Sequence, residues 1–176
     1  MRSLLLNLME QGEDIQAREL RPERLGDHLD RLYRAAWALC GSPHEAEDLV
    51  QEMYARVLAR PRLLRRGDEL GYLMRALRNT FFSQRRTAGR RPVEAAEEEA
   101  DRSPRGAAPG AEEIAESREV YRVIAELPED FREALVAVDV AGLSYREAAR
   151  ALRVPEGTLT SRVFRARAQV ARALSA

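Results

Sequence analysis

Residues 143–174 read LSYREAARALRVPEGTLTSRVFRARAQVARAL, and this stretch decides how the C-terminal half of the chain folds. Ser144 followed three residues later by Glu147 has the pattern of a capping box, which predicts a short helix from Tyr145 to Leu152. Pro155 disfavours helical backbone at the residue before it and suits the first turn of a new helix. The pattern therefore predicts two helices joined by a tight turn, the second of them long.

The second predicted helix is amphipathic, and its polar face is basic and rich in hydroxyls. Its apolar stripe recurs at helical spacing in Leu159, Val163, Ala166 and Val170. From Ser144 to Ala176 seven arginines stand against two glutamates, a net charge of +5. Such a pair is typical of a DNA-binding helix-turn-helix. Two amphipathic helices of any all-α protein, with solvated arginines, would give a similar pattern. The outer face carries Thr158, Ser161, Arg162, Arg165 and Gln169.

Composition favours an all-α protein of one or two small domains. Alanine, leucine, arginine and glutamate dominate the 176 residues, and every one of the 29 basic residues is arginine. The net charge is zero overall, but it divides into blocks: −4 over residues 1–59, +8 over 60–91 and −6 over 94–119. This alternation predicts segments with different partners.

Several classes of function are disfavoured by the same sequence. Cys40 is the single cysteine, and His28 and His44 lack the spacing of metal ligands, so we expect neither a disulfide nor a metal site. No glycine-rich phosphate loop and no catalytic constellation stands out, so we expect no cofactor and no enzymatic activity. The apolar run near the N-terminus ends by Met9, too short to span a membrane and without a signal-peptide cleavage pattern, which predicts a cytoplasmic protein without membrane insertion.

The sequence pattern of the N-terminal half predicts three helices. The first spans about Pro22 to Cys40 and ends at Gly41, and its apolar face contains Leu25, Leu29, Leu32, Tyr33, Ala36 and Leu39. The second is capped by Ser42, with Glu45 as the partner in a capping box, and ends at Pro61. Its predicted buried face is Ala46, Leu49, Val50, Met53 and Val57.

A third helix is predicted from Glu69 to about Thr87, after a basic loop with Arg62, Arg65 and Arg66 and a cap at Asp68. Leu70, Leu73, Leu77 and Phe81 form its core side. The other side is expected to be mostly exposed, and its aromatic and arginine side chains suit stacking on unpaired bases as well as they suit packing. That side consists of Tyr72, Arg75, Arg78, Asn79, Phe82, Ser83, Arg85 and Arg86.

The segment around residues 88–116 is rich in Ala, Gly, Pro and Glu and has almost no large apolar residue, so it reads as a flexible acidic linker. A helical pattern resumes near Ile114, and Pro128 opens a further helix that Gly142 stops, with Phe131, Leu135 and Val138 facing inward. The predicted organisation is an N-terminal extension (1–21), a three- or four-helix bundle (22–90), a linker (91–116) and a helix-turn-helix domain (117–176).

Two stretches resemble the bacterial RNA polymerase sigma factors of the extracytoplasmic-function group, in the sigma-70 family. HEAEDLVQEMYARVLAR, from His44, is similar to their region 2 signature, and LPEDFREALVAVDVAGLSYREAARALRVPEGTLTSRVFRAR, from Leu127, is similar to their region 4. The resemblance covers about residues 25–90 and 118–174. It implies a non-enzymatic subunit that binds core RNA polymerase, directs it to promoters and promotes DNA melting.

The resemblance also implies a role for each surface. Residues matching the contact with the clamp helices of the largest polymerase subunit are Asp48, Gln51, Glu52 and Arg56. Those matching the minus-10 contact are Tyr72, Arg75, Arg78, Asn79, Phe82, Ser83, Arg85 and Arg86. Those matching the minus-35 contact are Thr158, Thr160, Ser161, Arg162 and Arg165. Further implied partners are the flap of the second-largest subunit, promoter DNA and a dedicated anti-sigma factor, which is common in the family.

The chain departs from the family pattern at a few positions, and other classes of protein share parts of it. Tyr72 stands where tryptophan is common, Ser83 where aspartate is frequent, and Thr160 where a basic residue is frequent. A helix-turn-helix transcription regulator is one alternative, but its receiver domain would require an alternating βα pattern in the N-terminal half. A sigma mimic that binds only an anti-sigma factor is another, and the arginine-rich segment 60–91 argues against it.

Overall fold

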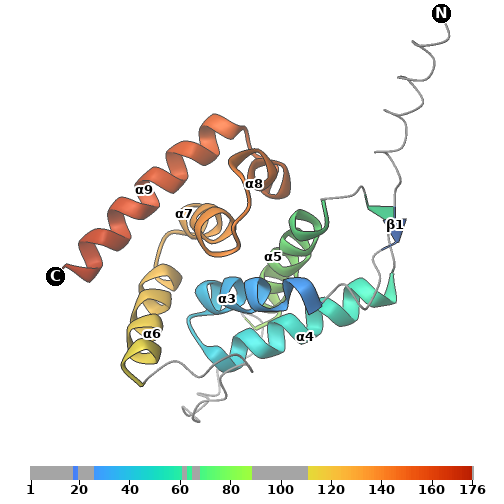
Figure 1. Ribbon diagram of the computed structural model, residues 1–176, viewed down its shortest axis with the longest axis horizontal. Coiled ribbons are helices and arrows are strands. Elements are labelled where there is room, and N and C mark those ends of the chain that lie inside the picture. The colour runs from blue at the N-terminus through green and yellow to red at the C-terminus, as the bar shows by residue number, and fades with distance from the viewer. Residues whose placement is uncertain (1–17, 20–25, 61–62, 65–67, 89–110, 176) are drawn as a thin grey trace, which may run out of the picture.

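The computed structural model describes residues 18–19, 26–60, 63–64, 68–88 and 111–175, which are almost entirely helical (Figure 1). The helices are η2 (Gly26–His28), α3 (Leu29–Cys40), α4 (Pro43–Ala59), α5 (Glu69–Ala88), α6 (Ala111–Ala125), α7 (Glu129–Leu135), the π-helical turn η3 (Val136–Val140), α8 (Tyr145–Leu152) and α9 (Glu156–Leu174). The all-α prediction is confirmed. One short pairing was not predicted: β1 (Arg18–Glu19) is antiparallel to β2 (Leu63–Leu64).

Helices α3, α4 and α5 pack together as an N-terminal bundle. Its centre is filled by side chains that water does not reach, and these come from the predicted apolar faces. The predicted core sides of α4 and α5 are confirmed at every position. The largest fully buried side chains of this bundle are Leu32, Leu49, Met53, Leu73 and Leu77.

The start of the first helix was predicted too early. A 3₁₀ turn occupies Gly26–His28, and the α-helix begins only at Leu29, which is 42% exposed and not in the core. Leu25 lies outside the described residues. The end of the helix is as predicted: Gly41 adopts a left-handed conformation (φ 82°), and its N–H donates to the Trp37 carbonyl at 2.7 Å.

The cap of α4 forms only in part. The Ser42 side chain accepts a hydrogen bond from the Glu45 N–H at 3.5 Å, but the Ser42 N–H does not donate to the Glu45 carboxylate in return, so the predicted capping box is incomplete. Pro43 is the first helical residue, as expected. The helix ends at Ala59, and Pro61 lies outside the described residues.

Helices α6 to α9, with η3, form a C-terminal bundle in which α9 packs along α7, α6 and α8. Helix α8 has the predicted bounds and the predicted capping box, with both the Ser144 and the Glu147 bonds present. Arg153 ends it in a left-handed conformation (φ 59°). Pro155 is the N-cap of α9 and not its first helical residue, a shift of one position from the prediction. Leu159, Val163 and Ala166 are buried as predicted.

Helix α6 begins at Ala111, inside the predicted linker of residues 91–116. Alanine and glutamate are strong helix formers, so the helix extends beyond its apolar residues toward the N-terminus. Residues 91–110 of that linker lie outside the described residues, as do residues 1–17 of the N-terminal extension and the basic-loop residues Arg62, Arg65 and Arg66.

The two bundles pack directly against each other. Helix α3 contacts α6, α7 and η3, and α5 contacts α8 (Figure 1). The rings of Trp37 on α3 and Tyr121 on α6 have centroids 4.7 Å apart. Gly41 lies so near α6 that a Cβ at this position would meet the Ala125 Cβ at 3.0 Å. Glycine is thus required at residue 41 both by the backbone conformation and by the approach of the second bundle.

Candidate nucleic-acid and protein interfaces

The polar face of α4 is open to solvent. Asp48 and Gln51 are exposed, and Glu52 is half-exposed beside them. The Arg56 Nε donates to Glu52 Oε1 at 2.6 Å, an i,i+4 pair that partly neutralises Glu52. Asp48 lies near His44, whose Nε2 is 4.0 Å from the Asp48 Oδ2. The face is therefore acidic and accessible to a basic protein surface.

The face of α5 that was expected to be mostly exposed is only partly so. Asn79, Arg85 and Arg86 are exposed, as predicted. Five others are partly buried, because α8 lies against this side of the helix and Glu133 of α7 reaches it: Tyr72, Arg75, Arg78, Phe82 and Ser83. Helical periodicity correctly predicted the side of α5 that faces the N-terminal core. It could not predict that the C-terminal bundle packs against another side of the same helix.

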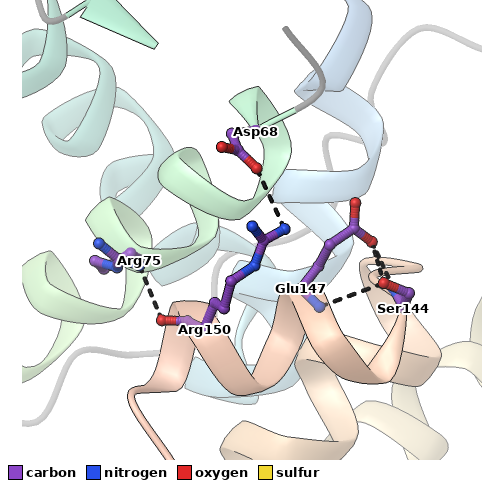
Figure 2. A network of polar contacts seen from close by, with 5 residues as sticks. All are labelled: Asp68, Arg75, Ser144, Glu147 and Arg150. Atoms are coloured by element: carbon purple, nitrogen blue, oxygen red, sulfur yellow. Dashed lines mark hydrogen bonds and ion pairs between the residues drawn. The ribbon is translucent and has the colours of Figure 1, made fainter. Parts of the chain in front are cut away.

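Arg75 contacts the last turn of α8 (Figure 2). Its Nη2 donates to the Arg150 carbonyl at 2.9 Å and its Nε to the Ala151 carbonyl at 3.3 Å. In return, Arg150 Nη2 donates to Asp68 Oδ1 at 3.3 Å, at the start of α5 (Figure 2). The Asp68 carboxylate, predicted as a helix cap, thus bonds across the two bundles. Tyr72 lines a pocket of about 180 Å³, and Asp68, Arg75, Glu147 and Arg150 also line it.

Arg78 is held between an aromatic ring and a buried carboxylate. Its guanidinium carbon lies 5.0 Å from the centroid of the Phe82 ring, within cation–π range. Its Nε lies 2.8 Å from Glu133 Oε1 of α7, whose side chain is 4% exposed. The two atoms form an ion pair without an aligned hydrogen bond. Burial raises the pKa of Glu133, and the Arg78 contact opposes that shift.

Phe82 also packs edge-on against Phe81, with centroids 5.2 Å apart, and lies against the core. The structure therefore supports the packing role that the sequence left open for this side chain. Its partial exposure still leaves part of the ring accessible.

On α9, three of the five predicted DNA-contacting side chains share an exposed surface: Thr160, Ser161 and Arg165. Arg165 has no ion pair among the described residues. Thr158 is partly buried. Arg162 reaches back to α7, where its Nη2 donates to Asp130 Oδ2 at 2.6 Å, so in this structure it holds the helix-turn-helix together.

Phe164 is a candidate that the sequence analysis missed. It is 74% exposed on α9, next to Arg165 in sequence and outside the buried stripe of Leu159 and Val163. The sequence did contain a signal for it: a large aromatic residue outside the apolar stripe of an amphipathic helix indicates a functional contact. Its ring suits apolar contact with a thymine methyl group.

Buried charges at the junction of the bundles were also missed. Arg132 on α7 is 6% exposed, and its Nη1 donates to the Ala125 carbonyl at 2.6 Å and to the Leu39 carbonyl at 3.3 Å. Its guanidinium carbon also lies 5.5 Å from the Phe81 ring centroid. Burial lowers the pKa of Arg132, with Arg85 adding to the effect. Charged residues in a helix are read from sequence as exposed, so no pattern pointed to this one.

The described residues offer no group of three or more His, Cys, Asp or Glu side chains that would hold a metal ion. Cys40 is a free thiol whose pKa is raised to about 12, chiefly by burial, which makes it a poor nucleophile. Within the part of the chain that the structure describes, no helix has the length and apolarity needed to cross a membrane.

Comparison with protein families gives two matches that together follow the two bundles. Residues 25–91 match the family model for sigma-70 region 2, and residues 117–170 match that for sigma-70 region 4. The ECF RNA polymerase sigma factor SigE of Mycolicibacterium smegmatis is 39% identical over 152 residues, covering 84% of this chain but only 59% of the relative. EcfG of Rhodopseudomonas palustris, also an ECF RNA polymerase sigma factor, is 38% identical over 136 residues, covering 77% of this chain and 74% of that protein.

Among solved structures, the fold is similar to the sigma factor RpoE of Bartonella quintana, crystallised in complex with the anti-sigma factor NepR. The TM-score is 0.66 at 27% identity, over 87% of this chain and 95% of that one. CnrH, in complex with the cytosolic domain of CnrY, has a similar fold, with a TM-score of 0.57 at 20% identity. Each of the two structures matches 87% of this chain, which is more than one bundle contains, so the similarity extends over both bundles.

Proposed function

Because the chain belongs to the ECF sigma factors of bacterial RNA polymerase, we propose that it binds core polymerase, directs it to specific promoters and promotes DNA melting. The observation that carries the proposal is the pairing of two matched regions, each with its own exposed polar face. The described residues 26–60 and 68–88 are helical, which disfavours a response regulator with a βα receiver domain. The activity requires binding energy alone and no covalent step. Because transcription takes place there, the proposal places the protein in the cytoplasm.

We assign the exposed acidic face of α4 to core polymerase. Asp48, Gln51, Glu52 and Arg56 are available there without disturbing the buried face of the same helix. Acidic side chains suit the clamp helices of the largest subunit, provided that surface is basic. The C-terminal bundle is assigned to the flap of the second-largest subunit.

We assign the polar face of α5 to the opened minus-10 strand and the exposed face of α9 to the minus-35 element. Tyr72 and the accessible part of Phe82 are suited to stacking, with Ser83 beside them. The charged and amide groups are suited to phosphates and base edges: Arg75, Arg78, Asn79, Arg85 and Arg86. On α9, we assign Arg165 and Ser161 to the major groove, together with Thr158, Thr160 and Phe164. Arg162 would reach DNA only by leaving Asp130.

An anti-sigma factor is the remaining proposed partner. Its support is the similarity to a sigma factor whose crystal structure contains one. Co-purification of the chain with a candidate anti-sigma protein, followed by loss of polymerase binding, tests this partner separately from the activity itself.

The decisive experiment is transcription in vitro with purified core polymerase and genomic template. We expect initiation at a defined set of promoters only when the chain is added, and permanganate footprints of an opened minus-10 region. Replacing Tyr72 and Phe82 by Ala is expected to reduce opening more than closed-complex binding, because each stacked base contributes about 1–3 kcal/mol. Initiation that is indifferent to the chain would refute the proposal.

A further inference from the structure

Two ion pairs join α9 to α7 and the turn η3. The Arg162 Nη2 donates to Asp130 Oδ2, in the first turn of α7, at 2.6 Å. The Arg167 Nε and Nη2 donate to the two carboxylate oxygens of Asp139, in η3, at 2.8 and 2.6 Å. We call these two contacts the flanking pairs. The inference that follows rests on the minus-35 role proposed above for α9.

The flanking pairs lie on opposite sides of the buried stripe of α9. At 3.6 residues per turn, each residue advances the helix by about 100°, so Arg167 lies about 140° from Arg162 around the axis. The fully buried Val163 and Ala166 project between these two directions. One pair therefore resists rotation of α9 about its own axis in one sense, and the other pair resists rotation in the opposite sense.

Packing alone gives this part of α9 little resistance to rotation. Ala166, next to Arg165, is fully buried, but its side chain is a single methyl group without an extended shape that neighbours could lock. A rotation of about 20° moves a group on the helix surface, about 5–6 Å from the axis, by about 2 Å. Such a shift exceeds the tolerance of a specific hydrogen bond, which Ser161 and Arg165 would need for reading base edges.

The Arg167 pair has the geometry of a contact that fixes orientation. Two parallel hydrogen bonds join the planar guanidinium to the planar carboxylate. The side chains of Arg167 and Asp139 are 53% and 31% exposed, and a pair this exposed contributes little to the free energy of unfolding. Asp139 belongs to a π-helical turn, a feature frequent at functional sites. The pair therefore orients α9 more than it stabilises the fold.

The Arg162 pair has a second consequence, which concerns charge. Arg162 lies about 60° from Arg165 around the helix, at the border of the surface assigned to DNA. A free arginine at this border would contact a phosphate, which raises the affinity for all DNA sequences alike. Asp130 neutralises this arginine and holds its side chain at 22% exposure. Non-specific binding by α9 is lowered as a result.

We propose that Asp130 and Asp139 are positioning residues for minus-35 recognition. Their ion pairs fix the rotation of α9, so that Ser161 and Arg165 meet the base edges in one orientation. The Asp130 pair also withholds Arg162 from the phosphates. The chain thereby gives up some affinity for DNA in general and gains discrimination between promoters, although neither aspartate contacts DNA itself.

Competition between promoter duplexes for the holoenzyme tests the proposal. One duplex carries the minus-35 element of a promoter found in the transcription assay, and the others carry single-base changes in that element. Closed complexes are measured in the cold over a range of salt, with Asp130→Ala, Asp139→Ala and the double variant. Wild-type holoenzyme is expected to prefer the unchanged element about ten-fold, and the double variant at most about three-fold.

A merely structural role for the two aspartates gives a different result. It would lower the urea midpoint and weaken binding to every duplex by the same factor. We expect instead a nearly unchanged midpoint, because exposed ion pairs contribute little to stability. For Asp130→Ala we also expect tighter binding to the changed duplexes and a salt slope steeper by about one unit, because Arg162 is released to a phosphate.

Two further variants make the test specific to the flanking pairs. Asp139→Arg with Arg167→Asp restores a pair with exchanged charges, so discrimination is expected to return, whereas Arg167→Asp alone is expected to lack it. Glu126→Gln is the matched control, because it breaks an exposed pair with Arg122 within α6, and it is expected to leave discrimination unchanged.

Wild-type discrimination by the double alanine variant would overturn the proposal. A loss shared by Glu126→Gln, or one that a folded exchanged pair does not reverse, would overturn it as well. Failure of the minus-35 assignment itself looks different: wild-type holoenzyme would then bind the unchanged and changed duplexes equally, Arg165→Ala would alter neither, and the role of the aspartates would fall with the assignment.

Discussion

Replacing Arg132 by Met tests whether one buried guanidinium holds the junction of the two bundles. Its Nη1 reaches the Leu39 carbonyl in the last turn of α3 and the Ala125 carbonyl at the end of α6. Leu39 has no helical partner for its carbonyl, because the residue four positions later is Pro43, which lacks an N–H. Met fills a similar volume and donates no hydrogen bond, so the variant isolates the polar contribution.

The expected loss follows from two opposing terms. Hydrogen bonds from a charged donor contribute about 1.5–3 kcal/mol each, and two are removed. Against this, burial disfavours the charged form, as the lowered pKa of Arg132 indicates, and its Nε has no partner, at a cost of about 1–3 kcal/mol. The net destabilisation is then about 2 kcal/mol. With a urea dependence of about 2 kcal/mol per molar, the unfolding midpoint moves down by about 1 M.

Urea unfolding followed by circular dichroism and by Trp37 emission measures this loss, and Arg122→Met is the matched control. Arg122 forms an exposed pair with Glu126, at 62% and 65% side-chain exposure, so its replacement is expected to cost less than about 0.5 kcal/mol. A midpoint for Arg132→Met no lower than that of the control would refute the reasoning, because the two carbonyls would then be satisfied without the guanidinium.

Four further outcomes are expected. Arg165→Ala is expected to lower minus-35-dependent transcription about ten-fold and to leave core binding intact, because an arginine contact with a base contributes about 1–3 kcal/mol. Arg172→Ala, in the last turn of α9, is the control and is expected to change this transcription little; equal promoter use by the two variants across a range of salt would contradict the assignment of α9. Charge reversal of Asp48 and Glu52 weakens core binding measured by fluorescence anisotropy without moving the urea midpoint, and Glu119→Lys on α6 is the control. Cys40 is partly buried and its pKa is raised to about 12, so it is expected to react with a thiol reagent about 10³-fold more slowly in the native chain than in urea; a native rate equal to the unfolded one would show that the thiol is not shielded. The capping bonds from Ser144 hold the pKa of Glu147 below its usual value, so their contribution is present above about pH 4.5 and is lost as pH falls through the lowered pKa; the midpoint difference between wild type and Glu147→Gln should shrink toward low pH, and a constant difference would contradict it.

Much of the fold was predictable, because local signals and helical periodicity agree over most elements. Ser144 and Glu147 determine the start of α8, and Pro155 excludes a continuous helix, so its bounds followed from short-range chemistry. Gly41 and Gly142 stop their helices in the left-handed conformation that glycine adopts without strain. Where only weak signals were present, as at the start of α3, the prediction was wrong by several residues.

The candidate sites were predictable as residues but not as contacts. A polar face of one helix looks the same in sequence whether it meets solvent, DNA or another polar surface. Arg75 and Arg78 illustrate this, since their partners are separated from them by more than 50 residues and include two backbone carbonyls. The π-helical turn η3 is similar: its Ala141 N–H donates to the Val136 carbonyl, and no residue type in that run marks the wider turn.

The charges at the junction of the bundles explain why sequence patterns could identify two domains and still not predict how they pack. On the α3 side the interface is apolar, because one cluster of buried side chains runs through both bundles and includes residues of α3 and η3. On the α5 side the contact is polar and involves Arg75, Arg78 and Glu133. Arg132 bonds to a carbonyl of each bundle, and the rings of Trp37 and Tyr121 pack together beside it. Charged groups are as common on a solvated helix face as in such a contact, so their pattern does not distinguish the two. A polar contact adds no hydrophobic stripe to α5, and the packing of α8 and α7 against this helix therefore could not be predicted from the sequence.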